Sequence, residues 1–345
     1  MKNHQILFTR PNVAELQENQ LPDALREREV LIKTIYTVIS PGTERANLIG
    51  EINISGERSA CRAAFPRKLG YCGIGKVERV GSAVTAVKPG QKVVIYFGKH
   101  SEYNIVPESN AIPIDVEGVD DLSAALLVIA GFPAEGVRKT RLEFGESAMV
   151  VGLGILGLIV VQICRVAGAV PVIAVDPNPK RRQLALQYGA DTVLDPSDND
   201  FVEQVLERTD GKGVNVIVEA SGNSAALRQA LLTCAPMGRV SLLGCTRTPD
   251  TYDLYHDVHY KGVSLIGAHN FARPKMESAP GNWTAADDFR AMMKLIACGR
   301  LNLRALVSEI HAPQEAPEVY ARLAEGRDFP IGVMFDWRML STEDA

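Results

Sequence analysis

The 345-residue chain has no Cys-x-x-Cys pair, no Lys/Arg run of the kind that a nucleic-acid backbone would need and few aromatic side chains. Its 6 cysteines are scattered, so their spacing predicts neither a zinc-binding lobe nor a dithiol redox motif, and we expect reduced structural thiols. With 37 Lys and Arg against 41 Asp and Glu, the net charge is −4 and no basic face is expected, which argues against nucleic acid as a partner. An aromatic content of 6% gives no support for a large flat ligand.

No apolar run is long enough to predict a clear membrane span. The longest, residues 148–163, is near the length of a marginal membrane span, but its three glycines follow a phosphate-loop pattern and favour a buried strand and helix. The first residues enter a strand-like run without the apolar region of a signal peptide. We therefore expect a cytoplasmic protein with no membrane partner.

Two domains are expected for an ordinary globular composition at about 150 residues per domain. From residue 31 to 113, short β-branched runs alternate with Pro-Gly and Gly-Ser turns, which predicts a compact, mostly antiparallel β domain. Its clearest strands are residues 30–35, 75–81 and 91–96.

The pattern changes after residue 121, where strands alternate with helices. This alternation predicts an α/β fold with a doubly wound, six-stranded parallel sheet. The expected strands are 148–151, 170–175, 192–194, 214–218, 240–243 and 263–266, and the expected helices between them include 180–188, 201–208 and 225–234. A helix at 285–297 and a strand at 331–335 follow, and we assign them to the first domain because six strands already complete the sheet. The expected boundaries are therefore 1–122, 123–268 and 269–345.

A glycine-rich loop follows the first of the six strands. Gly152, Gly154 and Gly157 allow a tight turn, a close approach of the backbone to a pyrophosphate and close packing of helix on strand. The loop continues through Ile155 and Leu156 into an apolar helical run at 158–164, and the start of this helix offers free N–H groups to phosphates. The alternative is a tight strand–helix turn without a ligand.

An acidic residue supports the ligand-binding interpretation. Asp176 ends the next strand, where it can accept hydrogen bonds from ribose hydroxyls and repel a 2′-phosphate, so NAD is expected rather than NADP. Arg181 can temper that preference, unless it is a solvated helix residue. Ser221 and Gly222 follow the fourth strand and also face the expected cofactor, although Ser221 or Asn223 can equally cap the next helix.

These segments resemble the medium-chain dehydrogenase/reductase superfamily. The resemblance runs from residues 29–33 through 75–81 and 90–93 to 188–191. Residues 39–44, 69–75 and 100–103 are similar to the branch with bacteriochlorophyllide-type, glycoside and cyclitol dehydrogenases. The resemblance implies that a GroES-like β domain precedes a Rossmann domain and is completed by the end of the chain. It also implies a homodimer or homotetramer, with the edge strand after Lys261 as a candidate interface.

The zinc ligands of alcohol dehydrogenases in this superfamily are not found at the matching positions. Pro41 stands where those enzymes have cysteine, Tyr71-Cys72 where they have His-Glu, and Ala130 near the fourth ligand. Because a catalytic zinc needs three protein ligands, the comparison implies an enzyme without a metal.

Without zinc, side chains must manage the reacting oxygen. Tyr71 can donate a hydrogen bond to a carbonyl, and Thr43 matches the hydroxyl that relays protons in the superfamily. Tyr71 can instead fill space, and Thr43 can cap a helix beginning at Glu44. His100 and Glu44 are further candidates for acid–base chemistry and for orienting a substrate hydroxyl. His100 can equally be structural, and Glu44 can be a solvated carboxylate.

Two residues after the sixth strand, His269 and Asn270, are candidates for the substrate cleft, with an ordinary turn as the alternative. The favoured function is a zinc-independent, NAD-dependent dehydrogenase that interconverts a secondary alcohol and a ketone on a sugar, glycoside or cyclitol. One alternative is an NAD(P)H-dependent quinone or enone reductase. Another is a cofactor-binding sensor or partner subunit that has lost its catalytic centre.

Overall fold

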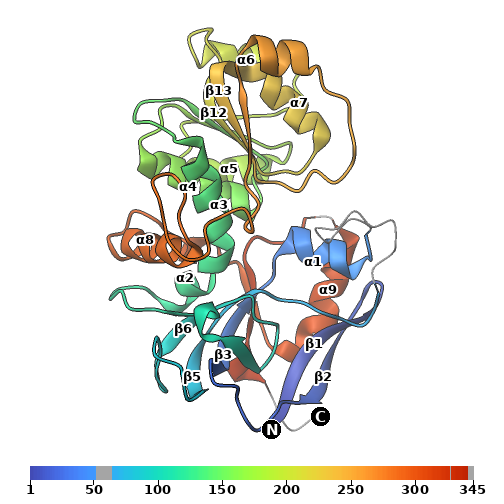
Figure 1. The fold of residues 1–345 in the computed structure, drawn as a ribbon. Helices are drawn as coiled ribbons and strands as arrows, with labels where there is room; N and C mark the ends of the chain where they lie inside the picture. Colours follow the sequence, from blue (N-terminus) through green and yellow to red (C-terminus); the bar gives the residue numbers. More distant parts are fainter. Residues whose placement is uncertain (52–63, 327, 341–345) are drawn as a thin grey trace. The chain divides into compact units, whose positions relative to one another are not determined.

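The computed structural model describes residues 1–51, 64–326 and 328–340, and it divides the chain into two compact units (Figure 1). Unit 1 comprises residues 1–129 and 302–345, and unit 2 comprises residues 130–301. Cys61, one of the cysteines counted in the sequence, lies outside the described residues. Among the helices in the described ranges, none is long and apolar enough to cross a membrane.

Unit 1 is built on two β-sheets. A seven-stranded sheet has the order β15-β16-β3-β5-β6-β8 with β7 paired to β3, and a three-stranded sheet has the order β2-β1-β4. The strands are β1 (Lys2–Arg10), β2 (Val13–Gln20), β3 (Glu29–Val38), β4 (Arg67–Lys68), β5 (Cys72–Val80), β6 (Lys92–Tyr96), β7 (Tyr103–Pro107), β8 (Ala111–Pro113), β15 (Glu309–His311) and β16 (Val333–Asp336). All pairs are antiparallel except β15 with β16.

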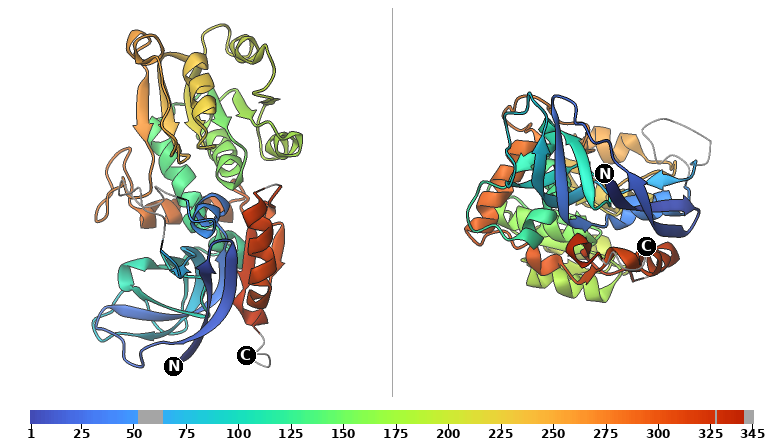
Figure 2. Two further views of the ribbon diagram at one scale, coloured as in Figure 1. Left: turned by 90° about the vertical axis from the view of Figure 1, so that its right-hand side faces the viewer. Right: turned by 90° about the horizontal axis from the view of Figure 1, so that it is seen from below.

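The core of this unit follows from strand alternation. In β3, Val30 and Ile32 point into one buried cluster, and of the residues that alternate with them Leu31 is buried and Lys33 is exposed, so both faces of this strand are largely covered. The helices are α1 (Pro41–Leu48), α2 (Asp121–Ala125) and α9 (Ala316–Glu325), with 3-10 turns η1 (Glu108–Asn110), η3 (Arg304–Leu306), η4 (Pro313–Glu315) and η5 (Trp337–Met339). Figure 2 shows α9 (red) alongside the blue strands of the N-terminal hairpin, which it contacts through β2.

The end of the chain completes unit 1. Strand β16 pairs antiparallel with β3, with Met334 opposite Val38, although almost 300 residues separate them. Phe335 and Tyr320 from this return segment pack with Phe8 and Leu48 in one buried cluster.

Unit 2 contains the six-stranded parallel sheet, in the order β11-β10-β9-β12-β13-β14. Its strands are β9 (Ala148–Val151), β10 (Val172–Val175), β11 (Thr192–Leu194), β12 (Val214–Glu219), β13 (Cys234–Leu242) and β14 (Ser264–Gly267). The helices are α3 (Leu127–Thr140), which begins at the end of unit 1, α4 (Ile155–Ala167), α5 (Pro179–Gln187), α6 (Phe201–Glu207), α7 (Ser224–Thr233), η2 (Tyr255–Tyr260) and α8 (Ala285–Ala297). The α/β fold and the doubly wound sheet expected from the sequence are confirmed.

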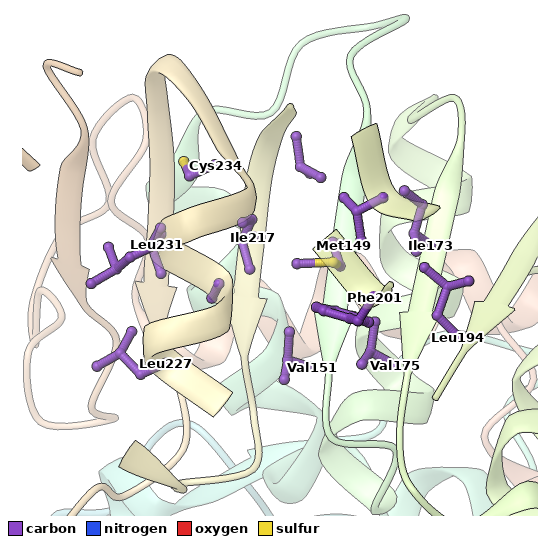
Figure 3. Close-up of a cluster of buried hydrophobic side chains, with 14 of the residues drawn as sticks. Met149, Val151, Ile173, Val175, Leu194, Phe201, Ile217, Leu227, Leu231 and Cys234 are labelled. Carbon is purple, nitrogen blue, oxygen red and sulfur yellow. The ribbon is translucent and has the colours of Figure 1, made fainter. Parts of the chain in front are cut away.

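Alternate residues of the strands face opposite sides of this sheet. Met149 and Val151 point toward α6 and α7, where they join a buried cluster with Phe201 and Leu231 (Figure 3). The intervening Val150 points the other way, toward the start of α4. Because strands of a parallel sheet are buried on both faces, they appear in the sequence as continuous apolar runs.

The second boundary between the units differs from the expected one. The chain returns to unit 1 at residue 302, not at 269, because the segment that ends in α8 is packed on α3. Phe289 lies against Gly131, where an added Cβ would be 2.6 Å from the ring. Asp288 of α8 is paired with Arg138 of α3 at 2.6 Å. Sequence alternation did not predict these contacts because they depend on a helix outside the repeating pattern. The first boundary falls at 129/130 rather than 122/123.

Candidate active site

The glycine loop of unit 2 joins β9 to α4. Gly152 has a φ of +89°, and a Cβ there would lie 2.8 Å from Ser221. A Cβ on Gly157 would lie 1.9 Å from the carbonyl oxygen of Gly152, so only glycine permits this approach of helix and loop. At Gly154, in contrast, no atom lies within 4 Å of the Cβ position. Packing therefore requires two of the glycines, and the third faces open space.

Helix α4 begins directly at this open position. Gly154 is its N-cap. Because glycine has no side chain, it cannot accept a hydrogen bond from the first N–H groups of the helix, which belong to Ile155, Leu156 and Gly157. These groups and the positive end of the helix dipole can hold phosphate oxygens. The structure thus brings together the five loop residues expected to bind a dinucleotide.

Asp176 lies beside the same loop. Its side chain is buried, Oδ2 accepts a hydrogen bond from the N–H of Leu153 at 2.8 Å, and Oδ1 accepts one from the N–H of Asn178 at 2.8 Å. Arg181 Nη1 lies 3.9 Å from Oδ2. Arg182 pairs with Asp195 at 2.7 Å, and its Nη1 donates to the backbone carbonyl oxygen of Asp176, also at 2.7 Å, instead of to the carboxylate. Of the two arginines, only Arg181 is therefore near the carboxylate.

Glu219, which the sequence interpretation did not select, organises the second loop. It ends β12, the strand next to β9, and its Oε1 accepts hydrogen bonds from the N–H groups of Ser221 at 2.7 Å and Gly222 at 3.0 Å. The hydroxyl of Ser221 donates to the same oxygen. Burial raises the pKa of this carboxyl, and the hydrogen bonds from Ser221 and Gly222 oppose that rise. An acidic residue directly after the apolar run 216–218 was the available signal.

The helix-capping alternative holds for one residue of this loop. Asn223 caps α7 by accepting a hydrogen bond from the N–H of Ala225 at 2.9 Å. Ser221 does not cap the helix, because its hydroxyl is directed to Glu219. Ser221 and Gly222 form a fixed loop at the carboxyl end of β12, next to Gly152.

In unit 1, Tyr71 and Thr43 lie together. The hydroxyl of Tyr71 donates a hydrogen bond to Ser40 Oγ at 2.6 Å and also interacts with the side chain of Thr43. Burial raises the pKa of Tyr71 well above its ordinary value, although the hydrogen bonds with Ser40 and Thr43 act in the opposite direction. Thr43 lies inside α1, whose N-cap is Ser40, so Thr43 is not the cap of that helix.

His100 and Glu44 form a buried pair. Both side chains have an exposed fraction of 0%, and His100 Nε2 lies 3.1 Å from Glu44 Oε2. Tyr320 donates to that same oxygen at 2.5 Å, and the N–H of Ser40 donates to Glu44 Oε1 at 2.9 Å. Glu44 is therefore not the solvated carboxylate that the sequence allowed, and it joins α1, α9 and the loop before β7.

The other ring nitrogen of His100, Nδ1, also has a hydrogen-bond partner. His100 Nδ1 lies 2.7 Å from Thr37 Oγ1, which accepts a hydrogen bond from Trp337 Nε1 at 2.9 Å. The hydroxyl of Thr37 can then donate to Nδ1, which leaves an N–H at Nε2 to donate to Glu44. Thr37, Trp337 and Tyr320 could not be associated with His100 from the sequence, because up to 300 residues separate these partners.

At the positions where zinc-dependent members of the superfamily have ligands, the side chains of this chain have other partners or a raised pKa. Burial, followed by the charge of Glu44, raises the pKa of the Cys72 thiol well above its ordinary value, which opposes the thiolate that zinc requires. Tyr71 is directed to Ser40, and Glu44 already accepts three hydrogen bonds. Across residues 1–51, 64–326 and 328–340, no group of three or more His, Cys, Asp or Glu is placed to hold a metal ion.

The two substrate candidates follow β14 in unit 2. His269 is exposed, and its carbonyl oxygen accepts a hydrogen bond from the N–H of Ala272 at 2.7 Å, as in the turn that the sequence also allowed. Asn270 is buried. Arg273 fixes this turn to α3 through Glu135, at 2.7 Å, and the carbonyl oxygen of Gly131, at 2.8 Å.

Comparisons with known proteins agree with the fold. Residues 156–296 match the family described as "Zinc-binding dehydrogenase". The L-threonine 3-dehydrogenase of Pyrococcus furiosus is 31% identical over 296 residues, which cover 76% of this chain and 81% of the relative. The D-guloside 3-dehydrogenase of Escherichia coli K12 is 28% identical over 353 residues, which cover 96% and 99%.

Solved structures show the same fold. The crystal structure of benzyl alcohol dehydrogenase from Acinetobacter calcoaceticus superimposes with a TM-score of 0.82 at 19% identity, covering 97% of this chain and 99% of the other. Unit 2, with its doubly wound sheet and glycine loop, has the Rossmann fold, and the sequence relatives are dehydrogenases. Together with these relatives, the fold shows that the chain belongs to the medium-chain dehydrogenase/reductase superfamily.

Proposed function

We propose that the chain is a zinc-independent, NAD-dependent dehydrogenase that interconverts a secondary alcohol and a ketone on a polyhydroxylated substrate. In the oxidative direction the substrate carbon loses a hydride to NAD⁺, and its hydroxyl loses a proton to give the ketone, NADH and H⁺. The observation that carries the proposal is the open position at Gly154, set between two glycines that packing requires and beside the carboxylate of Asp176.

Three groups in unit 2 bind the cofactor. The N–H groups at the start of α4 hold the pyrophosphate, and Asp176 accepts hydrogen bonds from the ribose hydroxyls. Ser221 and Gly222, fixed by Glu219, form the wall next to Gly152. The charge of Asp176 favours NAD over NADP, and Arg181 moderates that preference because its guanidinium is 3.9 Å from the carboxylate.

Tyr71 donates a hydrogen bond to the reacting oxygen, and Thr43 belongs to the path that carries its proton. Because burial raises the pKa of Tyr71, its phenol keeps its proton at neutral pH and acts as a donor rather than as a base. In ketone reduction Tyr71 donates to the carbonyl oxygen, and the hydroxyls of Ser40 and Thr43 supply the proton path behind it. In the reverse direction the same hydroxyls accept and pass on the proton.

His100 and Glu44 act as positioning residues. Neither side chain is exposed, so contact with substrate is not their role in this proposal. Glu44 holds the backbone of Ser40, and Ser40 accepts the hydrogen bond from Tyr71. His100 and Tyr320 keep Glu44 in place for this purpose.

Zinc independence is proposed on the chemistry of the residues at the matching positions. Proline and tyrosine supply no ordinary zinc ligand, and the one thiol there, Cys72, resists deprotonation. Metal analysis of the purified protein tests the point directly, because one tightly bound zinc per chain would require other ligands.

The substrate class is supported by one relative that matches nearly the whole chain. D-guloside 3-dehydrogenase covers 96% of it, and a guloside is a hydroxyl-rich glycoside. The hydroxyls of Thr43 and Tyr71 in unit 1 can form hydrogen bonds with such a ligand, and His269 and Asn270 remain the candidates of unit 2 for the same kind of contact. A homodimer or homotetramer is also proposed, with β14 at the contact, because this strand is one of the two edge strands of its sheet and Leu265 is 40% exposed.

A substrate panel tests the function. Purified protein is assayed with NAD and NADP against glycosides, sugars and inositols, and with NADH and NADPH against quinones and enones. The proposal predicts turnover of glycosides or polyols with NAD. Turnover confined to quinones or enones would favour a reductase. Binding of NADH without turnover of any compound would favour a sensor or partner subunit.

A further inference from the structure

Unit 2 contains a cavity that the proposed reaction does not use. It has a volume of about 520 Å³ and lies between α3, α4 and α8. Its walls include Val137, Ile163, Val166, Met292 and Leu295. Small-molecule sites are commonly about 300–1,000 Å³ and mostly apolar, so the cavity has an appropriate size and lining.

The cavity is separate from the glycine loop. The residues of α4 that line it, Ile163, Val166 and Ala167, belong to the last part of that helix. At about 1.5 Å per residue, even Ile163 lies about 12 Å along the axis from Ile155, where phosphates would bind. A ligand here would therefore not occupy the dinucleotide position.

A polar edge borders the apolar walls. Arg138 donates to Asp288 Oδ1 through Nε at 3.0 Å and Nη2 at 2.6 Å, and its guanidinium stacks on Trp283 at 3.7 Å from the ring centroid. Arg138 and Asp288 both line the cavity. These contacts fix the edge and place an indole ring close to it.

The ionic groups behind this edge carry an excess of positive charge. Asp288 is also paired with Arg273 at 3.2 Å, and Glu135 is paired with both Arg273 and Lys139 at 2.7 Å. Three cations, Arg138, Lys139 and Arg273, therefore share two carboxylates. The field in the cavity favours an anionic group.

Two oppositely charged side chains border the same cavity, Arg141 and Glu143. Arg141 follows α3 with a φ of +51°, and its Nε lies 3.5 Å from the Cβ position of Gly281. Within the part of the chain that the structure describes, its guanidinium makes no hydrogen bond or ion pair. The negative charge of Glu143 disfavours a second anionic group on the ligand, so the lining suits a ligand with one anionic group.

We infer that this cavity binds an amphipathic monocarboxylate, with its apolar body among the walls and its carboxylate on Arg141. A guanidinium presents paired N–H donors to a carboxylate, which an alcohol or an amine of the same length cannot use in this way. The inference is independent of the proposed dehydrogenase activity, because it rests on residues that take no part in it.

Fluorescence of the full chain provides a direct test. Trp283 is one of 2 tryptophans, and its stacking on Arg138 places it beside the cavity. Titration with decanoate should give a saturable change in emission that is lost in Trp283→Phe, and calorimetry should confirm one site. Decanol and decylamine should bind at least about tenfold more weakly, because neither carries a carboxylate.

Substitutions test separately the contact of the carboxylate with Arg141 and the binding of the apolar body in the cavity. Arg141→Gln should raise the Kd for decanoate at least about tenfold and remove the preference over decanol, because it removes the charged donor. Ala291→Phe should abolish binding by filling the cavity, since Ala291 lines it. Lys294→Gln removes an exposed charge of the same helix that does not line the cavity, and it should bind decanoate like the wild type.

The inference is wrong if decanoate shows no saturable binding, if decanol binds as tightly, or if Ala291→Phe binds decanoate unchanged while retaining the wild-type circular dichroism spectrum. It is also wrong if wild type binds no decanoate and Ala291→Phe lowers the mass measured by light scattering. That result would assign the cavity to a contact between copies of the chain.

Discussion

The glycine loop of unit 2 and the histidine network of unit 1 are organised differently. The loop takes its groups from residues 152–176, and it consists mainly of glycine conformations and backbone N–H groups, which are the proposed phosphate-binding groups. The network joins side chains of residues 37–337, each of which depends on the others for its hydrogen bonds. A loop made of backbone groups is determined by residues that are close in the sequence. A buried polar network forms only when the complete unit has folded.

The sharpest test of the loop compares two glycines. Gly157→Ala places a Cβ 1.9 Å from the carbonyl oxygen of Gly152, so α4 must shift. We expect NADH affinity to fall more than about 10²-fold, and the free energy of unfolding to fall by about 3 kcal/mol, because such overpacking is costly. Fluorescence titration with NADH and urea unfolding measure the two effects.

Gly154→Ala is the matched control. Its Cβ meets no atom within 4 Å, so the free energy of unfolding should change by less than about 0.5 kcal/mol. NADH affinity should still fall about tenfold, because the methyl group stands where the pyrophosphate approaches the backbone. Equal NADH affinity in Gly154→Ala and wild type would show that the open position is not the phosphate site.

In unit 1, Tyr71→Phe removes the proposed donor while keeping the ring. We expect kcat to fall about 10²-fold, with the KM for NAD unchanged, because the phenol acts on the reacting oxygen and not on the cofactor. Tyr96→Phe, a second tyrosine near Phe97, serves as the control and should retain wild-type kcat. Unchanged kcat in Tyr71→Phe would give Tyr71 a packing role.

Cofactor preference should respond to Asp176. In Asp176→Asn the charge that repels a 2′-phosphate is gone and Arg181 is released, so the ratio of kcat/KM for NADP over NAD should rise about 30-fold. Asp195→Asn removes a carboxylate that pairs with Arg182 instead, and its cofactor ratio should stay at the wild-type value. A shift of the same size in both variants would remove Asp176 from the ribose site.

The histidine network should show smaller effects on rate and a clear effect on stability. Tyr320→Phe leaves Glu44 without one of its buried donors, which should lower the free energy of unfolding by about 1–3 kcal/mol. As Glu44 holds Ser40, kcat should fall by about 5-fold with the KM for NAD unchanged, in the manner of a positioning residue. Loss of stability with wild-type kcat would restrict the network to a structural role.

The same tyrosine predicts a dependence on pH. Burial and the neighbouring Glu44 raise the pKa of Tyr320 in the folded chain, so the folded state keeps a proton that the unfolded state loses near pH 10. The stability from this group is present below pH 10 and lost as the pH rises toward the folded pKa, by at most about 1.4 kcal/mol per pH unit. Urea unfolding between pH 8 and 11 should therefore give a shallower decline for Tyr320→Phe than for wild type.

The sequence predicted the fold of unit 2 well because parallel strands buried on both faces leave continuous apolar runs. Five of the six expected strands occur with shifts of at most two residues at their ends, whereas β13 begins at Cys234 and not at residue 240; the helix at 285–297 begins and ends as expected. The loop from Gly152 to Asp176 was equally visible, since its residues are close in the chain. The unit to which α8 belongs was not visible, because it depends on pairing of Asp288 with Arg138.

The network of unit 1 shows the limit of sequence reasoning. His100 and Glu44 were selected as separate candidates, but nothing in the chain indicated that they face each other. Their partners Thr37, Tyr320 and Trp337 are ordinary residues of β3, α9 and η5, brought together by the pairing of β16 with β3. Burial of the pair, and hence an indirect role, follows from packing that no local motif describes.

Turnover after removal of metals tests the central claim most directly. Protein dialysed against a strong chelator, with zinc content verified by mass spectrometry, is assayed with NAD and the best glycoside substrate of the panel. The account predicts that kcat/KM stays at the value of the untreated protein with less than about 0.05 zinc per chain. Loss of activity in proportion to the zinc removed, with recovery when zinc is returned, would contradict it.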